Sequence, residues 1–395
     1  MSKIKTGLDN LIQSTGEQRK IKGNIAYLGN HASVNSELHN GLDILISIYG
    51  DNLLRAFGPQ HGYYMIAQDN MVETPHEVHP LHGIPVYSLY SETRRPTEEM
   101  IDKIDTIVVD LQDVGTRVYT YIWSLFHIME AVQARDTGVV VLDRPNPIGG
   151  TLIQGNLPEE DFFSFVCRSK IPMRHGMTIG EIARWFKMRH FPGIKLDIIK
   201  LLGYQRRMTW KDTGMAWINP SPNLPTPDSC QAYPGTVLFE GTNISEGRGT
   251  TRSLEIIGHP DIKAYQWKDD LDKFLKNNRI EGYFLRPVFF EPVFNKFSGR
   301  LCSGYQLHVT NPDKFNPWKL GQLVMSFLFN RIGPGEFWNT RPYEYEYQGL
   351  AIDWINGTDK LREFIEKQVL EEKIDEIENT GMLEFKELRQ ECLLY

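Results

Sequence analysis

The sequence contains little cysteine, which limits the kinds of site it can form. The four cysteines among its 395 residues are Cys167, Cys230, Cys302 and Cys392, and no two of them have a metal-binding spacing. Neither a disulfide framework nor a zinc knuckle is supported, and reduced thiols are expected. The N-terminal segment lacks the apolar core of a signal peptide, so we expect a cytoplasmic protein, although a trimmed secreted form would look the same.

Several other common signatures are missing. No window approaches the roughly 18 apolar residues that a membrane-spanning helix needs, so no membrane partner is expected. The net charge of −7 disfavours nucleic acid as a partner, because like charges repel. No Gly-x-Gly-x-x-Gly follows the first strand pattern, and no phosphate loop ends in Gly-Lys-Ser/Thr. Dinucleotide and nucleoside triphosphate binding are therefore poorly supported, and we expect no cofactor.

Hydrophobic strand patterns and helix patterns alternate in the first 150 residues. The predicted strands are at 23–28, 53–57, 84–88, 107–110 and 138–142. The predicted helices between them are at 36–49, 97–103 and 119–135. Continuous apolar strands alternating with helices are typical of a parallel sheet covered on both faces. The sequence therefore predicts an α/β protein whose first domain, residues 1–150, is a Rossmann-like doubly wound parallel sheet.

Residues 151–395 are predicted to form a second, smaller domain, because the whole chain exceeds one comfortable core. This part has mixed α/β (α+β) patterns, with a strand at 305–310 and a charged amphipathic helix at 360–377. Between 210 and 252 it is dense in Pro, Gly, Asn, Ser and Thr. So long an irregular stretch is usually functional, and we expect residues 240–252 to enter a cleft shared with the first domain.

Two carboxylates directly follow the apolar strand pattern at 107–110. Asp110 and Asp113 come at the end of this strand, before a turn at Gly115, an Arg117 and an aromatic-rich helix pattern. In an open α/β sheet, ligands bind at the carboxyl ends of the strands. The loops predicted to line one pocket at that edge are 29–33, 58–73, 88–94, 110–117 and 143–150.

The acidic residues of these loops suit glycoside hydrolysis, which generally uses two carboxyl groups. The acidic candidates are Glu73, Asp110, Asp113, Asp143, Glu181, Glu240 and Glu246. A structural alternative stays open for Asp143 and Glu181, as helix caps or as partners of Arg144 and Arg174. For Glu181 the capping-box pattern from Thr178 explains the residue without any function.

Four histidines raise the question of a metal site. His76, His79 and His82 are spaced at i, i+3 and i+6 in a stretch that also contains Pro75 and Pro80, which differs from the i, i+4 pair of zinc hydrolases. We therefore interpret them as surface-loop histidines and expect no metal. His61 differs, because the motif Gly58-Pro-Gln-His-Gly62 places it at a strand end, where we expect contact with substrate.

The segment from Glu246 to Arg252 combines two arginines with two threonines. Guanidinium groups bind carboxylate or phosphate through two parallel hydrogen bonds. Arg248 and Arg252 therefore suggest an anionic group on the substrate, with a solvated loop as the alternative. Aromatic residues are frequent near these loops, as expected where sugar rings stack, although core packing explains some of them.

Six motifs, in this order, resemble one known family. They are Gly58-Pro-Gln-His-Gly62, Asp110-Leu-Gln-Asp-Val-Gly-Thr-Arg117 with Tyr119-Thr-Tyr-Ile-Trp123, Asp143-Arg-Pro-Asn-Pro147, His175-Gly-Met-Thr178, Glu240-Gly-Thr-Asn-Ile-Ser-Glu-Gly-Arg-Gly-Thr-Thr-Arg252, and Lys296-Phe-Ser-Gly299 with Gln306-Leu-His-Val-Thr310. Over nearly its whole length, the sequence resembles the NamZ/YbbC-type exo-β-N-acetylmuramidases, glycoside hydrolase family 171.

The resemblance implies an enzyme that removes β-1,4-linked N-acetylmuramic acid from the non-reducing end of peptidoglycan fragments, such as muropeptides. It also implies that Arg248 and Arg252 hold the lactyl carboxylate of that sugar. The motif of the family reads Gly-Pro-Glu-His-Gly, whereas this sequence has Gln60, and a neutral amide is neither an acid nor a base catalyst. We therefore expect Glu73, which resembles a second glutamate of the family, and Asp110 to be the catalytic carboxyls.

The remaining predicted site residues are expected to bind the saccharide. They are Asn30, Gln60, His61, Asp113, Arg117, Tyr121, Asp143, Arg144, Asn146, His175, Asn243, Glu246, Arg248 and Arg252. Two other functions stay open. One is a saccharide-binding protein of the same fold without catalysis, and the other is a nucleotide-sugar or nicotinamide enzyme that uses the Rossmann-like domain.

Overall fold

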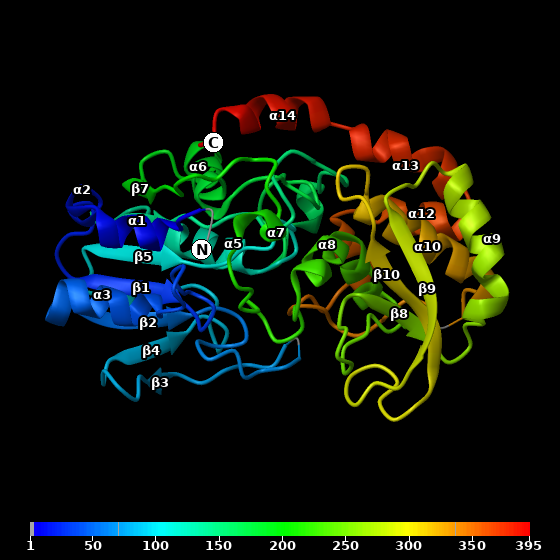
Figure 1. The fold of residues 1–395 in the computed structure, drawn as a ribbon, viewed down its shortest axis with the longest axis horizontal. Coiled ribbons are helices and arrows are strands. Elements are labelled where there is room, and N and C mark those ends of the chain that lie inside the picture. Colours follow the sequence, from blue (N-terminus) through cyan, green and yellow to red (C-terminus); the bar gives the residue numbers. More distant parts are fainter. Residues whose placement is uncertain (1–3, 70, 336) are drawn as a thin grey trace.

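The computed structural model describes residues 4–69, 71–335 and 337–395. Two sheets lie at opposite ends of the molecule, with loops and short helices between them (Figure 1). The first sheet has seven strands in the order β3-β4-β2-β1-β5-β6-β7, and the second has three in the order β8-β10-β9. This arrangement confirms the predicted α/β fold with a second, smaller domain.

The first sheet is parallel except at one edge, where β3 runs antiparallel to β4. Its strands are β1 (Ile25–Gly29), β2 (Leu53–Gly58), β3 (Glu77–Val78), β4 (Pro85–Ser88), β5 (Thr106–Asp110), β6 (Gly138–Leu142) and β7 (Leu196–Ile199). All five predicted strands are therefore confirmed. Every residue of β1 and β5 is buried, as their continuous apolar sequences require.

Helices cover both faces of this sheet (Figure 1). They are α1 (Gly7–Gln13), α2 (Thr15–Gln18), α3 (Gly41–Tyr49), α4 (Glu98–Ile101), α5 (Tyr121–Val132) and α6 (Ile179–Arg189), with the 3-10 turn η1 (Gly50–Asn52). The helix predicted from residue 36 begins only at Gly41, because the Asn40 side chain accepts a hydrogen bond from the Leu42 amide and caps it. The predicted capping box of Thr178 and Glu181 is present at α6.

The sheet extends beyond the boundary predicted at residue 150. Strand β7 pairs with β6 and adds residues 196–199 to the sheet, and α6 packs beside both strands. The sequence did not reveal β7 because it is an edge strand with an exposed Asp197 and only one fully buried residue, Ile199. The first structural unit therefore continues well past Gly150.

The second sheet is antiparallel and lies beside a group of helices (Figure 1). Its strands are β8 (Ile256–His259), β9 (Tyr283–Phe290) and β10 (Cys302–Val309). The remaining elements are η2 (Glu160–Phe162), α7 (Trp210–Thr213), α8 (Pro227–Thr236), η3 (Val237–Gly241), α9 (Ala264–Asn277), α10 (Pro317–Ile332), α11 (Ala351–Asn356), α12 (Lys360–Glu366), α13 (Leu370–Asn379) and α14 (Met382–Gln390). Among the helices described, none has the length and apolar character needed to cross a membrane.

Two predictions for this second part need correction. The helix predicted at 360–377 is two helices, because Gln368 has a φ of 56° and this left-handed residue interrupts the helix between α12 and α13. The stretch at 210–252 is less irregular than its composition indicates. It contains α8, where Thr226 and Ser229 form a capping box and Pro227 occupies the first turn, a position that tolerates proline.

Arg117 joins the two parts of the molecule. Its guanidinium group is completely buried and donates hydrogen bonds of 2.8–3.1 Å to the carbonyl oxygens of Asn156, Ile171, Ile355 and Asn356. Two of these carbonyls lie in α11, more than 230 positions along the chain. The loop after β5 is thereby attached to the second domain.

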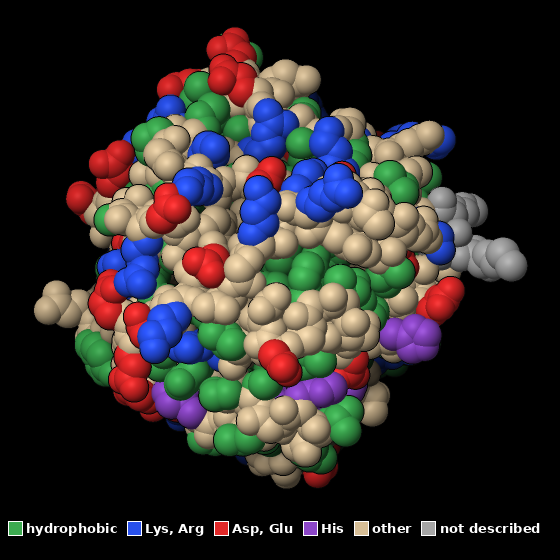
Figure 2. Space-filling model, turned by 90° about the vertical axis from the view of Figure 1, so that its left-hand side faces the viewer, with side chains coloured by type: hydrophobic (Ala, Val, Ile, Leu, Met, Phe, Trp, Pro, Cys, Tyr) green, Lys and Arg blue, Asp and Glu red, His purple; other side chains and the backbone are tan. Residues whose placement is uncertain are grey.

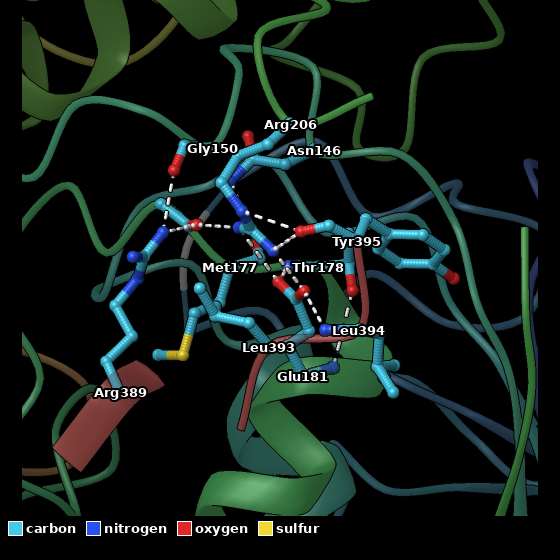
Figure 3. Close-up of polar contacts among 12 residues, drawn as sticks. Asn146, Gly150, Met177, Thr178, Glu181, Arg206, Arg389, Leu393, Leu394 and Tyr395 are labelled. Carbon is cyan, nitrogen blue, oxygen red and sulfur yellow. Dashed lines mark hydrogen bonds and ion pairs between the residues drawn. The ribbon is translucent and has the colours of Figure 1, made fainter. Parts of the chain in front are cut away.

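The last residues of the chain return to the first sheet and add a second connection (Figures 1 and 3). Arg206 forms an ion pair with Glu181 and donates to the carbonyl oxygen of Tyr395 at 3.2 Å. The Tyr395 hydroxyl donates to Oδ2 of Asp143 at 2.7 Å, and Arg389 donates to the carbonyl oxygen of Gly150 at 2.6 Å. Residues 389–395 therefore pack on the side of the first domain that holds α6.

Figure 2 shows the face of the first domain that points away from the second sheet. Lys and Arg side chains are interspersed there with Asp and Glu, and hydrophobic side chains are scattered among them. This face therefore carries charge of mixed sign. The loops at the carboxyl ends of the strands lie on the opposite side, toward the second domain (Figure 1).

We predict that Arg117→Met destabilises the protein strongly. The change leaves four buried carbonyl acceptors without their donor, at about 1–3 kcal/mol for each unsatisfied group, so the free energy of unfolding should fall by at least ~3 kcal/mol. Urea unfolding measures this change. Arg135→Met is the control, because the Arg135–Glu98 pair is exposed and should contribute less than about 1 kcal/mol. Equal unfolding midpoints for the two variants would contradict the role of Arg117.

Candidate active site

A cleft lies between the carboxyl edge of the first sheet and the second domain. It has an outer cavity of about 880 Å³ and a small inner cavity of about 30 Å³. Glu240, Arg248 and Tyr343 line both cavities, so the two adjoin each other. The outer cavity has the size of a small-molecule site, whereas the inner one has room for only one or two water molecules.

The inner cavity is formed by residues from both domains. The first domain contributes Gln60 and His61 from the loop after β2, and residues 118–120 before α5. The second contributes Tyr233 of α8, Glu240 of η3, and the segment Tyr343–Glu344. Of the loops predicted to line one pocket, only 58–73 contributes lining residues, because residues 118–120 follow the predicted loop 110–117 and no residue of 88–94 lines either cavity. Neither 29–33 nor 143–150 lines either cavity.

A chain of buried ion pairs lies along the floor of the cleft. Arg248 contacts Glu240 at 2.5 Å and Glu246 at 3.2 Å, and Lys296 contacts Glu246 at 2.8 Å. The Tyr343 hydroxyl donates to Oε2 of Glu240 at 2.9 Å. Burial acts to raise the pKa of Glu246, but the charges of Lys296 and Arg248 outweigh it, so this pKa lies below its ordinary value. Glu246 is therefore an ionised carboxylate at neutral pH.

Lys296 also holds the loop that carries these acids. Besides Glu246, its ammonium group donates to the carbonyl oxygens of Phe239 at 2.7 Å and Ile244 at 3.0 Å. These contacts join the two ends of residues 239–246. The expectation that 240–252 enters the shared cleft is met by Glu240, Asn243, Glu246 and Arg248, whereas Arg252 lies outside it.

Glu344 has a different environment from the other acids of the cleft. Gln60 Nε2 donates to its Oε1 at 3.1 Å, and the Tyr90 hydroxyl donates to its Oε2 at 2.6 Å. Both donors are neutral, and the side chain is almost completely buried. Burial therefore raises the pKa of Glu344 to about 7. At neutral pH this carboxyl group is protonated in a substantial fraction of molecules.

His61 lines the inner cavity as an uncharged side chain. Its Nδ1 lies 2.7 Å from the carbonyl oxygen of Ala67, and burial lowers its pKa to about 4. A neutral imidazole that donates from Nδ1 has an acceptor at Nε2. His61 has a left-handed φ of 73°, and Gly62 follows with 79°, which re-aims the chain directly after β2. This placement agrees with the predicted contact to substrate.

Asp110 does not line the cleft. It is completely buried in an ion pair with Arg144 at 2.6 Å and accepts a hydrogen bond from the Tyr27 hydroxyl at 3.0 Å. Its position at the strand end was predicted correctly, but its charge is already compensated there. The structure thus places Asp110 and Arg144 in a buried ion pair outside both cavities, whereas the catalytic role of Asp110 stays a prediction.

Most other predicted residues around Asp110 are also engaged in buried structural contacts. Asp113 accepts from the Gly115 amide at 2.8 Å and lies 3.3 Å from His175. Asn30 donates to the Tyr121 hydroxyl at 2.7 Å, and Asn146 donates to the Met177 carbonyl at 3.0 Å. The residues predicted to bind substrate that do not line either cavity are Asn30, Asp113, Arg117, Tyr121, Asp143, Arg144, Asn146, His175 and Arg252.

Asp143 is a buried acid with several hydrogen-bond donors around it, as an active-site carboxyl group would be. It accepts hydrogen bonds from the Thr178 hydroxyl, the Gly180 amide and the Tyr395 hydroxyl, at 2.7–2.8 Å. Burial raises its pKa to about 7. The structural alternative that the sequence left open for Asp143 and Glu181 agrees with these contacts, since Glu181 caps α6 and pairs with Arg206.

Glu73 lies at the margin of the cleft rather than inside it. About half of its side chain is exposed, and it contacts Arg94 at 3.5 Å and the Tyr345 hydroxyl at 3.3 Å. Arg94 in turn packs 3.7 Å from the centre of the Tyr345 ring. Glu73 therefore supports the segment next to Glu344 and does not face either cavity.

The segment 337–350 was missed by the sequence analysis although it supplies much of the cleft. Trp338, Arg341, Tyr343 and Leu350 line the outer cavity, and Glu344 lines the inner one. The alternation of tyrosine and glutamate at 343–347 was a usable signal, because acids beside aromatics are common in saccharide sites. The segment has no helix or strand pattern in the sequence, so nothing placed it beside the first sheet.

The histidines of the 76–82 loop do not gather into a ligand set. His82 pairs with Asp43 at 2.6 Å, His76 lies 3.4 Å from Glu92, and His79 stacks on His82. Within residues 4–69, 71–335 and 337–395, no three His, Cys, Asp or Glu side chains are arranged to hold a metal ion.

Fold and site together describe a two-domain α/β protein with a carboxylate-lined cleft at the carboxyl edge of a Rossmann-like sheet. The chain belongs to the exo-β-N-acetylmuramidase NamZ family. The N-terminal family model matches residues 25–228, and the C-terminal model matches residues 231–395. The two models meet after β7, in agreement with the extended first sheet. The family resemblance inferred from the motifs is thereby confirmed.

Individual relatives agree with this membership. The peptidoglycan β-N-acetylmuramidase NamZ of Bacillus subtilis (strain 168) is 38% identical over 394 residues, which cover 100% of this chain and 92% of the relative. Two DUF1343 family proteins of Bacteroides fragilis NCTC 9343 have similar crystal structures. One has a TM-score of 0.86 at 28% identity with all of both chains covered, and the other 0.76 at 27% identity with 99% of each chain covered.

We predict that Glu73→Gln lowers turnover by less than about tenfold. An exposed ion pair such as Glu73–Arg94 contributes about 0–1 kcal/mol, and 1.4 kcal/mol corresponds to a factor of ten. Steady-state hydrolysis of a saccharide substrate measures the change. A loss of a hundredfold or more would return Glu73 to the catalytic role that the sequence indicated.

Proposed function

We propose that this protein is an exo-acting β-N-acetylmuramidase, which releases N-acetylmuramic acid from the non-reducing end of peptidoglycan fragments. The observation that carries the proposal is the cleft, in which carboxyl groups of contrasting environment meet at one end. Glu240 and Glu246 are paired with cations, whereas Glu344 contacts only neutral donors. Glycoside hydrolysis needs such a contrast, with one group ionised and one protonated. Membership of the NamZ family supports the same activity.

The shape of the cleft supports exo-action. The cavity narrows from about 880 Å³ to about 30 Å³ at the end that Gln60, Thr120 and Glu344 close. A saccharide chain therefore has no path through this end, so only the end of a chain approaches the residues around the inner cavity. The rest of the fragment extends into the outer cavity, where Phe297 and Trp338 offer aromatic surfaces.

The catalytic carboxyl groups are therefore proposed to be among Glu240, Glu246 and Glu344, which line the cleft. Glu73 and Asp110, which the sequence indicated, do not line either cavity. Glu73 contacts Arg94, and Asp110 is paired with Arg144. Gln60, His61, Asn243, Glu246 and Arg248 stay in the proposed substrate-binding set, because they line the two cavities. The four cysteines are free thiols, in accord with the proposed cytoplasmic location.

We predict that the purified protein hydrolyses a disaccharide in which N-acetylmuramic acid is β-1,4-linked to N-acetylglucosamine, with release of both sugars. The reversed disaccharide, with N-acetylglucosamine at the non-reducing end, is the matched control and should stay intact. Chromatography of the products measures both reactions. Binding of the first disaccharide without any hydrolysis would instead identify a non-catalytic saccharide-binding protein.

We propose that Arg341 contacts the lactyl carboxylate of the terminal sugar. Arg248 is already paired with Glu240 and Glu246, and Arg252 pairs with Glu255 outside the cleft. Arg341 lines the outer cavity, and no acidic partner for its guanidinium group is found in the described parts of the chain. It is therefore a cation of the cleft whose charge is available to an anionic ligand.

Arg341→Met should raise KM for the muramic acid disaccharide by about fivefold, which corresponds to an exposed ion pair of ~1 kcal/mol. The turnover number should change little, because the contact is the same in the ground and transition states. Arg252→Met serves as the control and should leave KM unchanged. An increase in KM for the Arg252 variant alone would contradict the role of Arg341 and would indicate that Arg252 binds the lactyl carboxylate.

A further inference from the structure

Glu344 is held in an unusual backbone conformation. Its φ is 47° and that of Tyr345 is 70°, so two successive non-glycine residues adopt the left-handed region. Side chains with a Cβ atom avoid this region, and such strain persists only where surrounding contacts impose it. Here, Tyr343 and Glu346 exchange backbone hydrogen bonds of 3.2 and 2.9 Å across the turn. The strained turn directs the Glu344 side chain to the inner cavity.

The side-chain contacts fix the orientation of the Glu344 carboxyl group. One oxygen accepts from Gln60 Nε2, and the other accepts from the Tyr90 hydroxyl. Gln60 is oriented in turn by Thr120, whose hydroxyl donates to Gln60 Oε1 at 2.6 Å. This contact leaves the amide nitrogen of Gln60 as the group that faces Glu344. The carboxyl group is thus placed by three side chains from the first domain, although it belongs to the second.

Charged and titratable groups around Glu344 come from every element that packs against it. They are His61 of the loop after β2, Tyr90 and Arg94 of the loop after β4, Tyr233 of α8, Glu240 of η3, Arg248, and the neighbouring Tyr343 and Tyr345. Arg94 and Arg248 are the cations among these residues. The Arg94 guanidinium group stacks on the Tyr90 and Tyr345 rings, and Arg248 is paired with Glu240 and Glu246. Glu240 adds a negative charge. This environment favours the protonated form of Glu344.

We propose that Glu344 donates the proton to the glycosidic oxygen, with Gln60 and Tyr90 as positioning residues. The proposal rests on the function proposed above and assigns its acid. The proton of the Glu344 carboxyl group moves to the glycosidic oxygen as the bond from that oxygen to C1 of the muramic acid breaks. The electron pair of this bond stays on the oxygen of the leaving sugar. Water supplies the new hydroxyl group at C1, and the proton it releases restores the Glu344 carboxyl, so only water is consumed.

The substitution Glu344→Gln tests this role with two substrates. The muramic acid disaccharide has a poor leaving group and needs a proton, so turnover should fall by a factor on the order of 10²–10⁴. The 4-nitrophenyl glycoside of N-acetylmuramic acid has a leaving group that departs as an anion and needs no proton. For this substrate the fold-decrease in turnover of the same variant should be less than about a tenth of the fold-decrease for the disaccharide. Comparing two substrates on one variant separates proton donation from a loss of folded protein.

Glu346→Gln is the matched control for this experiment. It makes the same exchange two residues away in the same turn, and Glu346 lines neither cavity. Both substrates should be hydrolysed at nearly the wild-type rate by this variant. Equal losses on both substrates in the Glu344 variant would overturn the proposal and make Glu344 a structural residue. Full activity of the Glu344 variant on the disaccharide would also overturn it.

The pH profile gives a second test that a structural role would not affect. The donor must be protonated, so kcat/KM should fall as the pH rises through the pKa of Glu344, which is about 7. Gln60→Glu replaces the neutral donor by a second carboxyl at the same contact. Two adjacent carboxyl groups raise the pKa of one of them, so the alkaline limb should move to higher pH. An unmoved limb would overturn the assignment of Gln60 as the positioning partner.

Wild-type activity distinguishes failure of this inference from failure of the proposed function. If the wild-type chain hydrolyses neither substrate, the function and the proton donor are both wrong. If it hydrolyses both and the Glu344 variant does as well, the function holds and the donor is another residue of the cleft.

Discussion

The buried guanidinium group of Arg117 is the contact on which the geometry of the cleft depends. It follows β5 closely and is bound by four carbonyl oxygens, two of which belong to α11 in the second domain. Residues 118–120, which line the inner cavity, are the next three in the chain. A carbonyl is neutral, so this cation is solvated by the protein without a carboxylate partner, and burial lowers its pKa. The position of the sheet edge is thereby tied to the second domain.

The acids of the cleft differ because their neighbours differ. Glu240 and Glu246 belong to an alternating series with Arg248 and Lys296, in which each buried charge compensates the cost of burying the next. Glu344 lies beside this series but is contacted by an amide and a phenol. One cleft therefore contains Glu246, whose pKa is lowered by its cationic partners, and Glu344, whose pKa is raised by burial to about 7. Acid–base chemistry needs both states at the same pH.

Asp110 shows what the local sequence could predict about this site and what it could not. The apolar run at 107–110 correctly predicted a buried strand that ends at the carboxyl edge, and the site does lie at that edge. The carboxylate was taken for a catalytic group because nothing in the local sequence showed its partner. That partner, Arg144, follows the next strand of the sheet, 34 positions later. The pairing of parallel strands brings the two together, so the charge of Asp110 is compensated by Arg144 below the cleft.

Five strands of the first sheet, the capping box of α6 and the family could be predicted from the sequence, because these depend on periodicity and on residues a few positions apart. Which acids line the cleft, and in which direction the pKa of each is shifted, depends on the packing of the two domains. Gln60 and Glu344 are 284 positions apart, and the local sequence of neither residue predicts that they are in contact. Burial and long-range partners set the charge of a carboxyl group, and both arise only when the two domains have packed together.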